Sequence, residues 1–451
     1  MPMVVLLAIF SSMRYGVHDV ITSPKSYILP SSFTTPAPPK SHNYISTRAA
    51  DLPQTELVAG VAGFNYFRNL YYFGSTFYVV TDEVEEMKKI EYTYVITGLK
   101  KEDAEGKSVE IPVEETWQVI SFEEAEELFK PVVVRKNGLT LFYADATSPN
   151  FLGHYFHLVA EMFLGAMRVQ AADGEYELPA RTIYRGTAAS RRDRYALNEW
   201  FNEIAMPNTA LEDQSVLQDR THSGIPYVYE RIVIADRWAA HKHGKNPRRW
   251  NKVTGDVPDV QVPADWFRPV RNSIKLAVLA SGCDIRRKDP SVPVVLYVNR
   301  QDTGRRLLAE DAESLAFELD ALHQQGLIEL HDVQMGKVSK LEQFCLACKA
   351  DVMLGVHGNG LTHQMWMKPG SAVLEMMTVG GHARDYNLLA DMVGHQYETI
   401  HNNHTFPREK WGSVGQGKNF HSSSIRADGK FVAELVLQKA QERIKNIEPS
   451  L

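Results

Sequence analysis

Cysteine is scarce in this chain of 451 residues, where it occurs only as Cys283, Cys345 and Cys348. Three cysteines are too few for a disulfide framework, and a structural zinc site would need histidines to complete its ligand set. Cys345 and Cys348 form a C-x-x-C pair in "VSKLEQFCLACKA", where apolar residues recur at helical spacing. Because a free thiol behaves as a small hydrophobic group, we expect this pair to pack in the core rather than to carry redox or metal chemistry.

An excess of charge of one sign is also missing. The chain has 49 Lys and Arg against 55 Asp and Glu, a net charge of -6, and no long block of one sign. This balance argues against broad electrostatic capture of nucleic acid or an anionic membrane. With 44% hydrophobic and 23% charged residues, the composition is that of a globular protein, and the length fits two or three domains.

Long hydrophobic runs are absent as well. The apolar run Val4 to Phe10 is far shorter than the roughly 20 residues of a membrane span, and neither a basic flank nor a cleavage site accompanies it. The Pro-, Ser- and Thr-rich stretch that follows predicts a disordered or stalk-like segment over residues 1–54. A single N-glycosylation sequon, Asn403-His404-Thr405, fits a secretory lumen but also arises easily by chance.

Residues 55–265 have the pattern of a mixed α/β domain. The runs "STFYVVTD", "YTYVIT", "KPVVVRKNGLTLFYAD", "ARTIYR" and "ERIVIADR" predict strands, and "SFEEAEELFK" and "LNEWFNEIA" predict helices. One helix should run from about 154 to 171, since its apolar residues share a face. The segment 242–270 carries charge, Gly and Pro without a period, so we place the domain change there.

From residue 266 the pattern becomes regular, and it predicts a second domain over 266–430 followed by a C-terminal helix over 431–451. Helices around 269–282, 304–326 and 338–350 separate the strands "VPVVLYVNR", "LIELHDV" and "DVMLGVHG", and a short helix precedes "AVLEMM". Strands separated by helices in this way favour a parallel, doubly wound sheet. Ligands of such sheets bind beyond the carboxyl ends of the strands.

The first strand end with candidate binding residues is "VNRQDTGRR", where Arg300 follows the strand and Arg305 lies at the start of the predicted helix. Guanidinium forks at a helix N-terminus suit a phosphate or diphosphate. The alternative is a solvated surface turn.

The second strand end is His357-Gly358-Asn359-Gly360. Its glycines would let the backbone approach a ligand, and helix amides near Gly360 would favour an anion, although the stretch matches neither a P-loop nor G-x-G-x-x-G. A plain strand-turn-helix junction, with His357 as a core histidine, explains it equally well. The third feature is Glu375 within "AVLEMM", which needs a partner because burying an unpaired carboxylate is costly. That partner is either a ligand hydroxyl or a nearby arginine.

"HYFHLVAE" places His154, His157 and Glu161 on one helix face. Such a face suits a general base near neutral pH. It could instead hold a metal ion, with help from His241 and His243, or it could be a packing face with satisfied histidines.

The segment "FCLACKADVMLGVHGNGLTHQMWMKPGSAVLEM" resembles glycosyltransferase family 61, which includes plant protein xylosyltransferases and O-linked N-acetylglucosaminyltransferases of the secretory pathway. It matches that family's helix, its Gly-x-His-Gly-Ala-Gly-Leu-Thr-Asn core, its Pro-Gly and its closing Glu. Arg300 and Arg305 resemble the family's paired arginines, and His157 and Glu161 match its Asn-x-x-His-x-x-x-Glu helix. The likeness spans roughly residues 145 to 380.

Four residues depart from the family pattern: Asn359 replaces Ala, His363 replaces Asn, His154 replaces the first Asn of the helix motif, and Ala309 stands where Asn is frequent. These departures affect the expected acceptor and sugar specificity more than the expected binding of the donor phosphates.

The resemblance implies a GT-B fold, with two Rossmann-like domains and an interdomain cleft, and an inverting transfer from a UDP-sugar. No metal is expected, and no Asp-x-Asp stands at a strand end. Arginine and backbone amides must then stabilise the leaving diphosphate. The implied donor-binding residues are Arg300, Arg305, His357, Gly358, Asn359, Gly360, Thr362 and Glu375. The implied base is His157, oriented by Glu161, with Asp236 after "RIVIAD" as the alternative.

The implied partners are a UDP-sugar donor, with xylose or N-acetylglucosamine most expected, and a glycan or glycoprotein acceptor. The implied location is the Golgi or endoplasmic reticulum, with an N-terminal membrane anchor that is missing or incomplete here. Two other hypotheses stay open: a non-catalytic glycan-binding descendant of the fold, and a histidine-dependent metallohydrolase.

Overall fold

The computed structural model describes residues 43–96, 116–145, 151–174, 176–244, 255–415, 417, 420 and 425–446. The run Val4 to Phe10 and most of the predicted stalk lie outside these residues. Strand β1 (Tyr44–Ser46) and the short helix η1 (Ala49–Asp51) fall within the last part of the predicted N-terminal segment. None of the helices in the described ranges has the length and apolar character needed to span a membrane.

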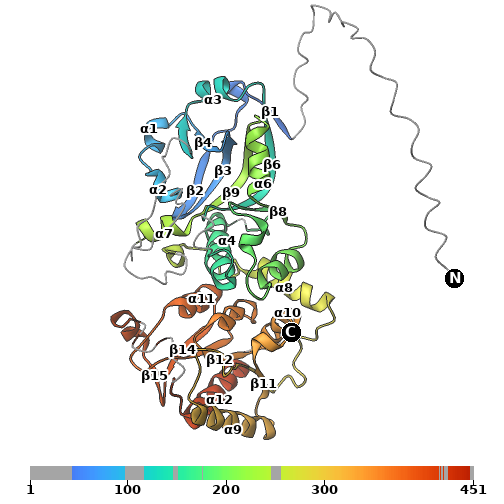
Figure 1. Ribbon diagram of the computed structural model, residues 1–451, viewed down its shortest axis with the longest axis vertical. Coiled ribbons are helices and arrows are strands. Elements are labelled where there is room, and N and C mark those ends of the chain that lie inside the picture. Colours follow the sequence, from blue (N-terminus) through green and yellow to red (C-terminus); the bar gives the residue numbers. More distant parts are fainter. Residues whose placement is uncertain are drawn as a thin grey trace, which may run out of the picture. The chain divides into compact units, whose positions relative to one another are not determined.

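Within the described residues, nine strands form the first sheet, drawn blue to green in Figure 1. The path is β5-β4-β3-β9-β6-β7-β8, with β1 paired to β6 and β2 paired to β3. Pairs β6·β9, β6·β7, β7·β8 and β4·β5 are parallel and the other pairs are antiparallel. Helices alternate with these strands along the chain, as predicted for a mixed α/β half. The remaining strands are β2 (Glu56–Val61), β3 (Phe64–Phe73), β4 (Thr76–Val80), β5 (Trp117–Ile120), β6 (Val132–Tyr143), β7 (Arg181–Tyr184), β8 (Ala210–Glu212) and β9 (Tyr227–Ala235).

The α-helices of this half are short, and one of them corrects the sequence prediction. "YTYVIT" was expected to be a strand, but its first four residues form helix α2, where Thr93 and Val95 are buried. The Thr93 hydroxyl bonds His243 Nε2 (2.8 Å), so packing against α7 overrides the β-propensity of this run. The helices are α1 (Val84–Met87), α2 (Tyr92–Val95), α3 (Phe122–Leu128), α4 (Leu164–Gln170), α5 (Leu197–Trp200), α6 (Gln214–His222) and α7 (Arg237–His243), with short turns η4 (Ala171–Asp173), η5 (Ala188–Arg191) and η7 (Val257–Asp259).

The predicted helix over 154–171 is present, but its first part is a π-helix. Residues Phe156–Phe163 form η3, which continues directly into α4. The predicted helix "LNEWFNEIA" likewise passes from α5 into a π-helical turn, η6 (Phe201–Ala205). π-Helical turns are frequent at functional sites because they alter which side chains share a face.

Six strands in the described part of the chain form the second sheet, in the order β11-β10-β12-β13-β14-β15. All pairs are parallel except β14·β15, which confirms the predicted parallel sheet. Strands β10, β12 and β13 are buried along their whole length, which explains their continuous apolar sequences. The strands are β10 (Val294–Val298), β11 (Glu329–Val333), β12 (Val352–Val356), β13 (Ala372–Met376), β14 (Gln396–His401) and β15 (His404–Phe406).

Helices cover both faces of the second sheet (Figure 1). Val295 and Leu354 face a core shared with α9 and α12, whereas Leu296 and Met353 face a core shared with α10, α11 and η9. The helices are α8 (Arg268–Ala280), α9 (Ala309–Gln324), α10 (Lys340–Lys349), α11 (Asp385–Val393) and α12 (Gly429–Lys445), with 3-10 helices η8 (Met335–Lys337), η9 (Asn359–Trp366) and η10 (Arg408–Ser413).

Helix α9 begins at Ala309, later than predicted, so Arg305 does not stand at a helix N-terminus. Residues before it form a bridge instead, in which Leu307 pairs with Ile425. The Ile425 amide donates to the Arg306 carbonyl and the Leu308 amide donates to the Ile425 carbonyl (3.1 and 3.0 Å). These long-range bonds occupy backbone groups that a longer helix would have used.

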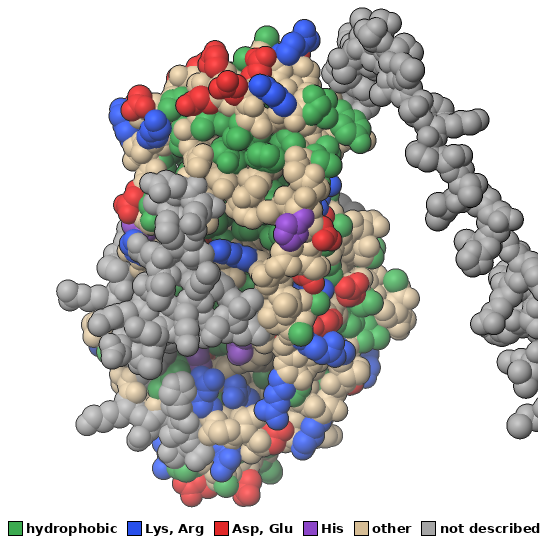
Figure 2. Space-filling model, turned by 45° about the horizontal axis from the view of Figure 1, so that its top comes forward, with side chains coloured by type: hydrophobic (Ala, Val, Ile, Leu, Met, Phe, Trp, Pro, Cys, Tyr) green, Lys and Arg blue, Asp and Glu red, His purple; other side chains and the backbone are tan. Residues whose placement is uncertain are grey.

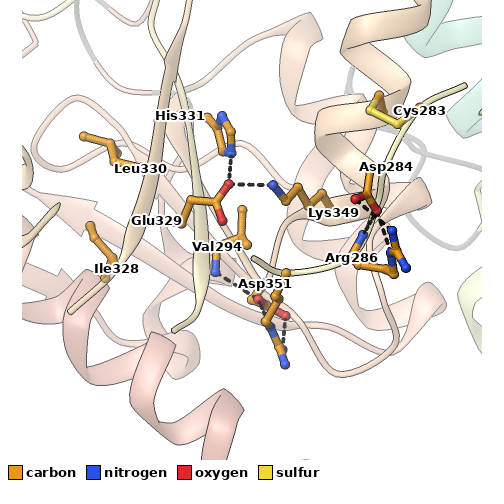
Figure 3. Close-up of polar contacts among 12 residues, drawn as sticks. Cys283, Asp284, Arg286, Val294, Ile328, Glu329, Leu330, His331, Lys349 and Asp351 are labelled. Atoms are coloured by element: carbon orange, nitrogen blue, oxygen red, sulfur yellow. Dashed lines mark hydrogen bonds and ion pairs between the residues drawn. A yellow bond between two sulfur atoms is a disulfide. The ribbon is translucent and has the colours of Figure 1, made fainter. Parts of the chain in front are cut away.

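The cysteines partly contradict the expectation of simple packing. Cys345 forms a disulfide with Cys283, which precedes β10, while Cys348 is free and buried as expected. Figure 3 shows Cys283 near the amino end of the second sheet. A single bridge does not need a framework of paired cysteines, and the spacing of the cysteines did not indicate that Cys283 and Cys345 would pair.

Candidate active site

Arg300 and Gly358 meet at the carboxyl ends of two neighbouring strands. Strands β10 and β12 are adjacent, with Val298 opposite Gly355, so the residues that follow them lie side by side. A Cβ on Gly358 would lie 1.2 Å from Arg300 Nη1, which leaves room only for glycine. Arg300 Nε donates to the Thr303 hydroxyl (3.2 Å) and the Arg305 carbonyl (3.3 Å), so its guanidinium is held in place.

A small cavity of about 150 Å³ opens beside these residues. Arg300, Asn359 and Gly360 line it, together with Tyr195 and Leu197 from the first half of the chain. Thr362 is fully buried, and its hydroxyl donates to Asn359 Oδ1 (3.4 Å), which ties the turn to the start of η9. Two residues of the predicted turn, Asn359 and Gly360, thus line one concave surface with Arg300, and Thr362 packs behind them.

Arg305 lies in the loop before α9, with its guanidinium 5.6 Å from the centre of the Phe420 ring. Its positive charge lowers the pKa of Arg300, although burial is the larger cause. Burial and His157 lower the pKa of His154 to about 4, and Arg305 adds to this shift. The two arginines and the helix of the first half therefore share one electrostatic environment.

His357 and Glu375 form a buried pair behind the turn. His357 Nδ1 is hydrogen-bonded to one carboxylate oxygen of Glu375, and the Tyr397 hydroxyl donates to the other. Glu375 is fully buried, and burial raises its pKa to about 8, against the opposing effects of Tyr397 and Arg305. The protein partners of Glu375 are thus His357 and Tyr397 rather than the arginine considered from the sequence.

His157, Glu161 and Arg237 form a second polar group on η3 and α7. His157 Nδ1 lies 2.5 Å from Glu161 Oε2, and Arg237 Nε donates to the same oxygen at 3.0 Å. Burial alone would raise the pKa of Glu161, but the charges of His157 and Arg237 outweigh it and lower the pKa to about 2. Glu161 is thus a carboxylate that fixes the orientation of the His157 ring.

Asp385 and Tyr386, at the start of α11, connect the two polar groups. Asp385 Oδ2 lies 3.7 Å from His357 Nε2, and burial, with the negative charges of Glu161 and Glu375, raises its pKa well above the usual range. The Tyr386 ring contacts both Phe156 on η3 and His357 (centroids 5.3 and 5.1 Å apart). Figure 2 shows histidines beside Lys and Arg side chains on one face.

Other predicted residues lie elsewhere or have structural partners. Asp236 caps α7 by accepting from the Ala239 amide (2.9 Å), and His243 bonds Thr93 rather than joining the histidines of η3. His154 does adjoin His157, with ring centroids 4.8 Å apart. Across the described ranges, no three His, Cys, Asp or Glu side chains are grouped to hold a metal ion.

Sequence reasoning missed Arg237, Asp385 and Tyr397. Arg237 had a usable signal, since it stands two positions past the end of an apolar strand, as Arg300 does. Asp385 and Tyr397 had none, because they reach the site only through long-range packing.

The described residues thus contain two Rossmann-like α/β domains of a GT-B fold, with charged groups beyond the strand ends of the second one, an architecture of nucleotide-sugar glycosyltransferases. The family model described as Glycosyltransferase 61 matches residues 155–374, which include η3, both site arginines and the 357–362 turn. The part of the chain from 155 to 374 thus belongs to glycosyltransferase family 61, as the resemblance indicated. A search of the curated proteins gave no match.

Proposed function

We propose that this protein is an inverting glycosyltransferase that moves a sugar, xylose or N-acetylglucosamine, from a UDP-sugar to a glycan or glycoprotein without a metal ion. Family membership suggests a transferase. The observation that supports the donor class is the guanidinium of Arg300, fixed against Gly358 at the carboxyl edge of a parallel sheet. Such a fork suits two oxygens of a diphosphate.

The leaving UDP gains negative charge as its bond to the sugar breaks. Arg300 and Arg305 supply positive charge at this point, and Asn359 and Gly360 of the turn line the same cavity as Arg300. Groups that are already oriented stabilise developing charge without reorganising. His357, Asn359, Gly360 and Thr362 complete the donor site, and Glu375 positions His357 from behind.

The acceptor hydroxyl needs a base on the opposite side of the sugar from the diphosphate. His157 is our candidate, because Nδ1 bonded to a carboxylate carries the proton and leaves the Nε2 lone pair available. Glu161 holds this tautomer, and Arg237 holds Glu161. Asp236 remains the alternative base, although its cap on α7 already uses one oxygen.

We also propose that the protein works in the lumen of the secretory pathway, in the Golgi or endoplasmic reticulum. The Cys283–Cys345 disulfide supports this location, because such bonds form and persist in oxidising compartments. The sequon residue Asn403 supports it too, since it is exposed in the tight turn between β14 and β15.

Titration calorimetry with UDP, in the presence of EDTA and then of added Mg²⁺ or Mn²⁺, tests the donor class. We expect binding in EDTA that Arg300→Ala abolishes, with the variant's folding checked by circular dichroism. No binding of UDP or UDP-sugars by folded protein under any of these conditions would refute the proposal. Transfer or donor hydrolysis that disappears in folded His157→Ala would exclude the non-catalytic alternative.

A further inference from the structure

A second and larger cavity, of about 1350 Å³, lies at the amino ends of the second sheet, away from the strand ends that carry Arg300 and His357. Lys368 and Gly394 line it and precede β13 and β14 respectively. Helix α8 forms one wall through Arg271 and Lys275. The position separates this cavity from the proposed donor site, because ligands of the Rossmann type bind at the opposite edge.

Basic side chains dominate the charged lining of this cavity. Seven of its residues are Lys or Arg and two are Asp, although the whole chain has a net charge of -6. The basic residues are Arg168, Arg268, Arg271, Lys275, Arg286, Arg287 and Lys368. A concave surface with such an excess of one sign attracts ligands of the opposite sign.

Two of these cations, Arg287 and Lys368, share a single buried carboxylate, that of Asp351. Arg287 binds both oxygens of Asp351 (2.8 and 2.6 Å), and Figure 3 shows Asp351 beside Val294 at the start of β10. Lys368 Nζ lies 3.7 Å from the same carboxylate, and burial lowers the pKa of Lys368. Burial also lowers the pKa of Arg271, to about 10. Arg271, Arg287 and Lys368 are thus partly removed from water. Among the described residues, only one carboxylate, that of Asp351, pairs with any of the three.

One nitrogen in each of two guanidinium groups near this cavity also lacks a hydrogen-bond acceptor, although Nη2 of Arg271 donates to the Val393 carbonyl (3.0 Å). Nε of Arg271 and Nε of Arg443 are buried without an acceptor among the described residues, and Arg443 lies against Gly370, next to the lining residue Pro369. Leaving a buried charged donor without an acceptor costs free energy. Lys275 forms no ion pair with any residue in the described ranges and faces the same cavity. Lys275 is exposed at the cavity wall, so acceptor oxygens of a ligand can pair with its ammonium group.

We propose that this cavity is a second binding site, which takes an acidic oligosaccharide whose sugars carry carboxylate or sulfate groups. The oxyanions contact Arg271, Lys275 and Lys368. The cavity exceeds the usual ~300–1,000 Å³ of a small-molecule site, so it has room for several sugar residues rather than a single anion. The choice of a glycan rests on the proposed function, in which the acceptor is a glycan or glycoprotein. The site then holds an acidic part of the acceptor away from the reacting sugar.

Fluorescence anisotropy with the full chain tests this, using labelled oligogalacturonate and sulfated dextran oligosaccharides, with neutral dextran and polyglutamate as comparison probes. We expect both acidic oligosaccharides to bind, and we expect added NaCl to weaken their binding. Lys275→Glu should weaken binding on the order of tenfold or more, since it reverses a charge that faces the ligand. Lys430→Glu, the same change at an exposed residue of α12, should have little effect, and Lys275→Arg should retain binding.

The proposal would be overturned by no binding of either acidic oligosaccharide, by equal binding of neutral dextran, or by equal losses in Lys275→Glu and Lys430→Glu. Tighter binding of polyglutamate than of the oligosaccharides would assign the cavity to an acidic peptide instead. Calorimetry with UDP on the same variants separates the two sites, because we expect Lys275→Glu to bind UDP like the unaltered protein. If the unaltered protein does not bind UDP, the proposed donor site is refuted, whereas the proposed site for the acidic oligosaccharide is not.

Discussion

The guanidinium of Arg300 occupies the space that a side chain at position 358 would need. A Cβ there would lie 1.2 Å from Arg300 Nη1, so the glycine and the arginine form one unit although they follow different strands. The arginine also bonds the backbone of its own loop at the Arg305 carbonyl. An added methyl group would therefore have to displace a side chain that is held at several points.

Gly358→Ala should weaken UDP binding on the order of tenfold to a hundredfold, as expected when a charge-assisted hydrogen bond is lost. The matched control is Gly304→Ala in the Arg300–Arg305 loop, where a Cβ would meet nothing within 4 Å. Calorimetry with UDP compares the two variants. Unchanged affinity in folded Gly358→Ala would show that the position of Arg300 does not govern donor binding.

Glu161→Gln should destabilise the fold by about 3–5 kcal/mol, because it leaves the buried Arg237 without its charged partner. The pKa of Glu161 is lowered to about 2, so its ionised form stabilises the fold above its ordinary pKa of 4.5. This contribution should disappear as the pH falls from about 4.5 towards 2.

Urea unfolding at several pH values measures this effect. The difference in free energy of unfolding between the unaltered protein and Glu161→Gln should shrink across that pH range. Glu434→Gln, at an exposed residue of α12, should show no such difference. A constant difference at every pH would mean that the carboxylate charge of Glu161 contributes nothing.

Removing the disulfide should lower stability by about 4 kcal/mol, the chain-entropy value for the 62-residue separation of Cys283 and Cys345. Thermal unfolding of the Cys283→Ser/Cys345→Ser variant, compared with the oxidised protein, measures it. Cys348→Ala is the control for loss of a buried sulfur alone. If reductant lowers the melting temperature of the double variant as much as that of the unaltered protein, the bridge is not the cause.

Asn403 should carry an N-linked glycan when the protein is made in a secretory pathway. Asn402 and Asn403 form the two-residue turn of the β14–β15 hairpin, and the exposed Asn403 leaves room for a glycan after folding. Intact mass before and after peptide N-glycosidase treatment measures it. Asn403→Gln and Thr405→Ala should remove the extra mass, whereas Thr405→Ser should keep it. An unmodified mass after secretion would contradict the prediction.

The order of strands and helices in the second domain was predictable because β10, β12 and β13 are buried on both faces and therefore continuously apolar. The loop that carries Arg305 could not be predicted. The Leu307–Ile425 bridge sets the start of α9, and this bridge joins segments that are far apart in the sequence. The partners of Glu375 were hidden for the same reason. Tyr397 lies in a strand with a mixed polar pattern, "QYETIH", which gives no sign of a buried hydroxyl.

The bonds from Arg300 Nε to Thr303 and to the Arg305 carbonyl also affect how tightly an anion can be held. A free arginine loses about 2 kcal/mol of rotamer entropy when a ligand immobilises it. Here that loss has already occurred during folding. An oxyanion that reaches this edge of the sheet therefore meets a preorganised partner, and more of the contact energy contributes to affinity.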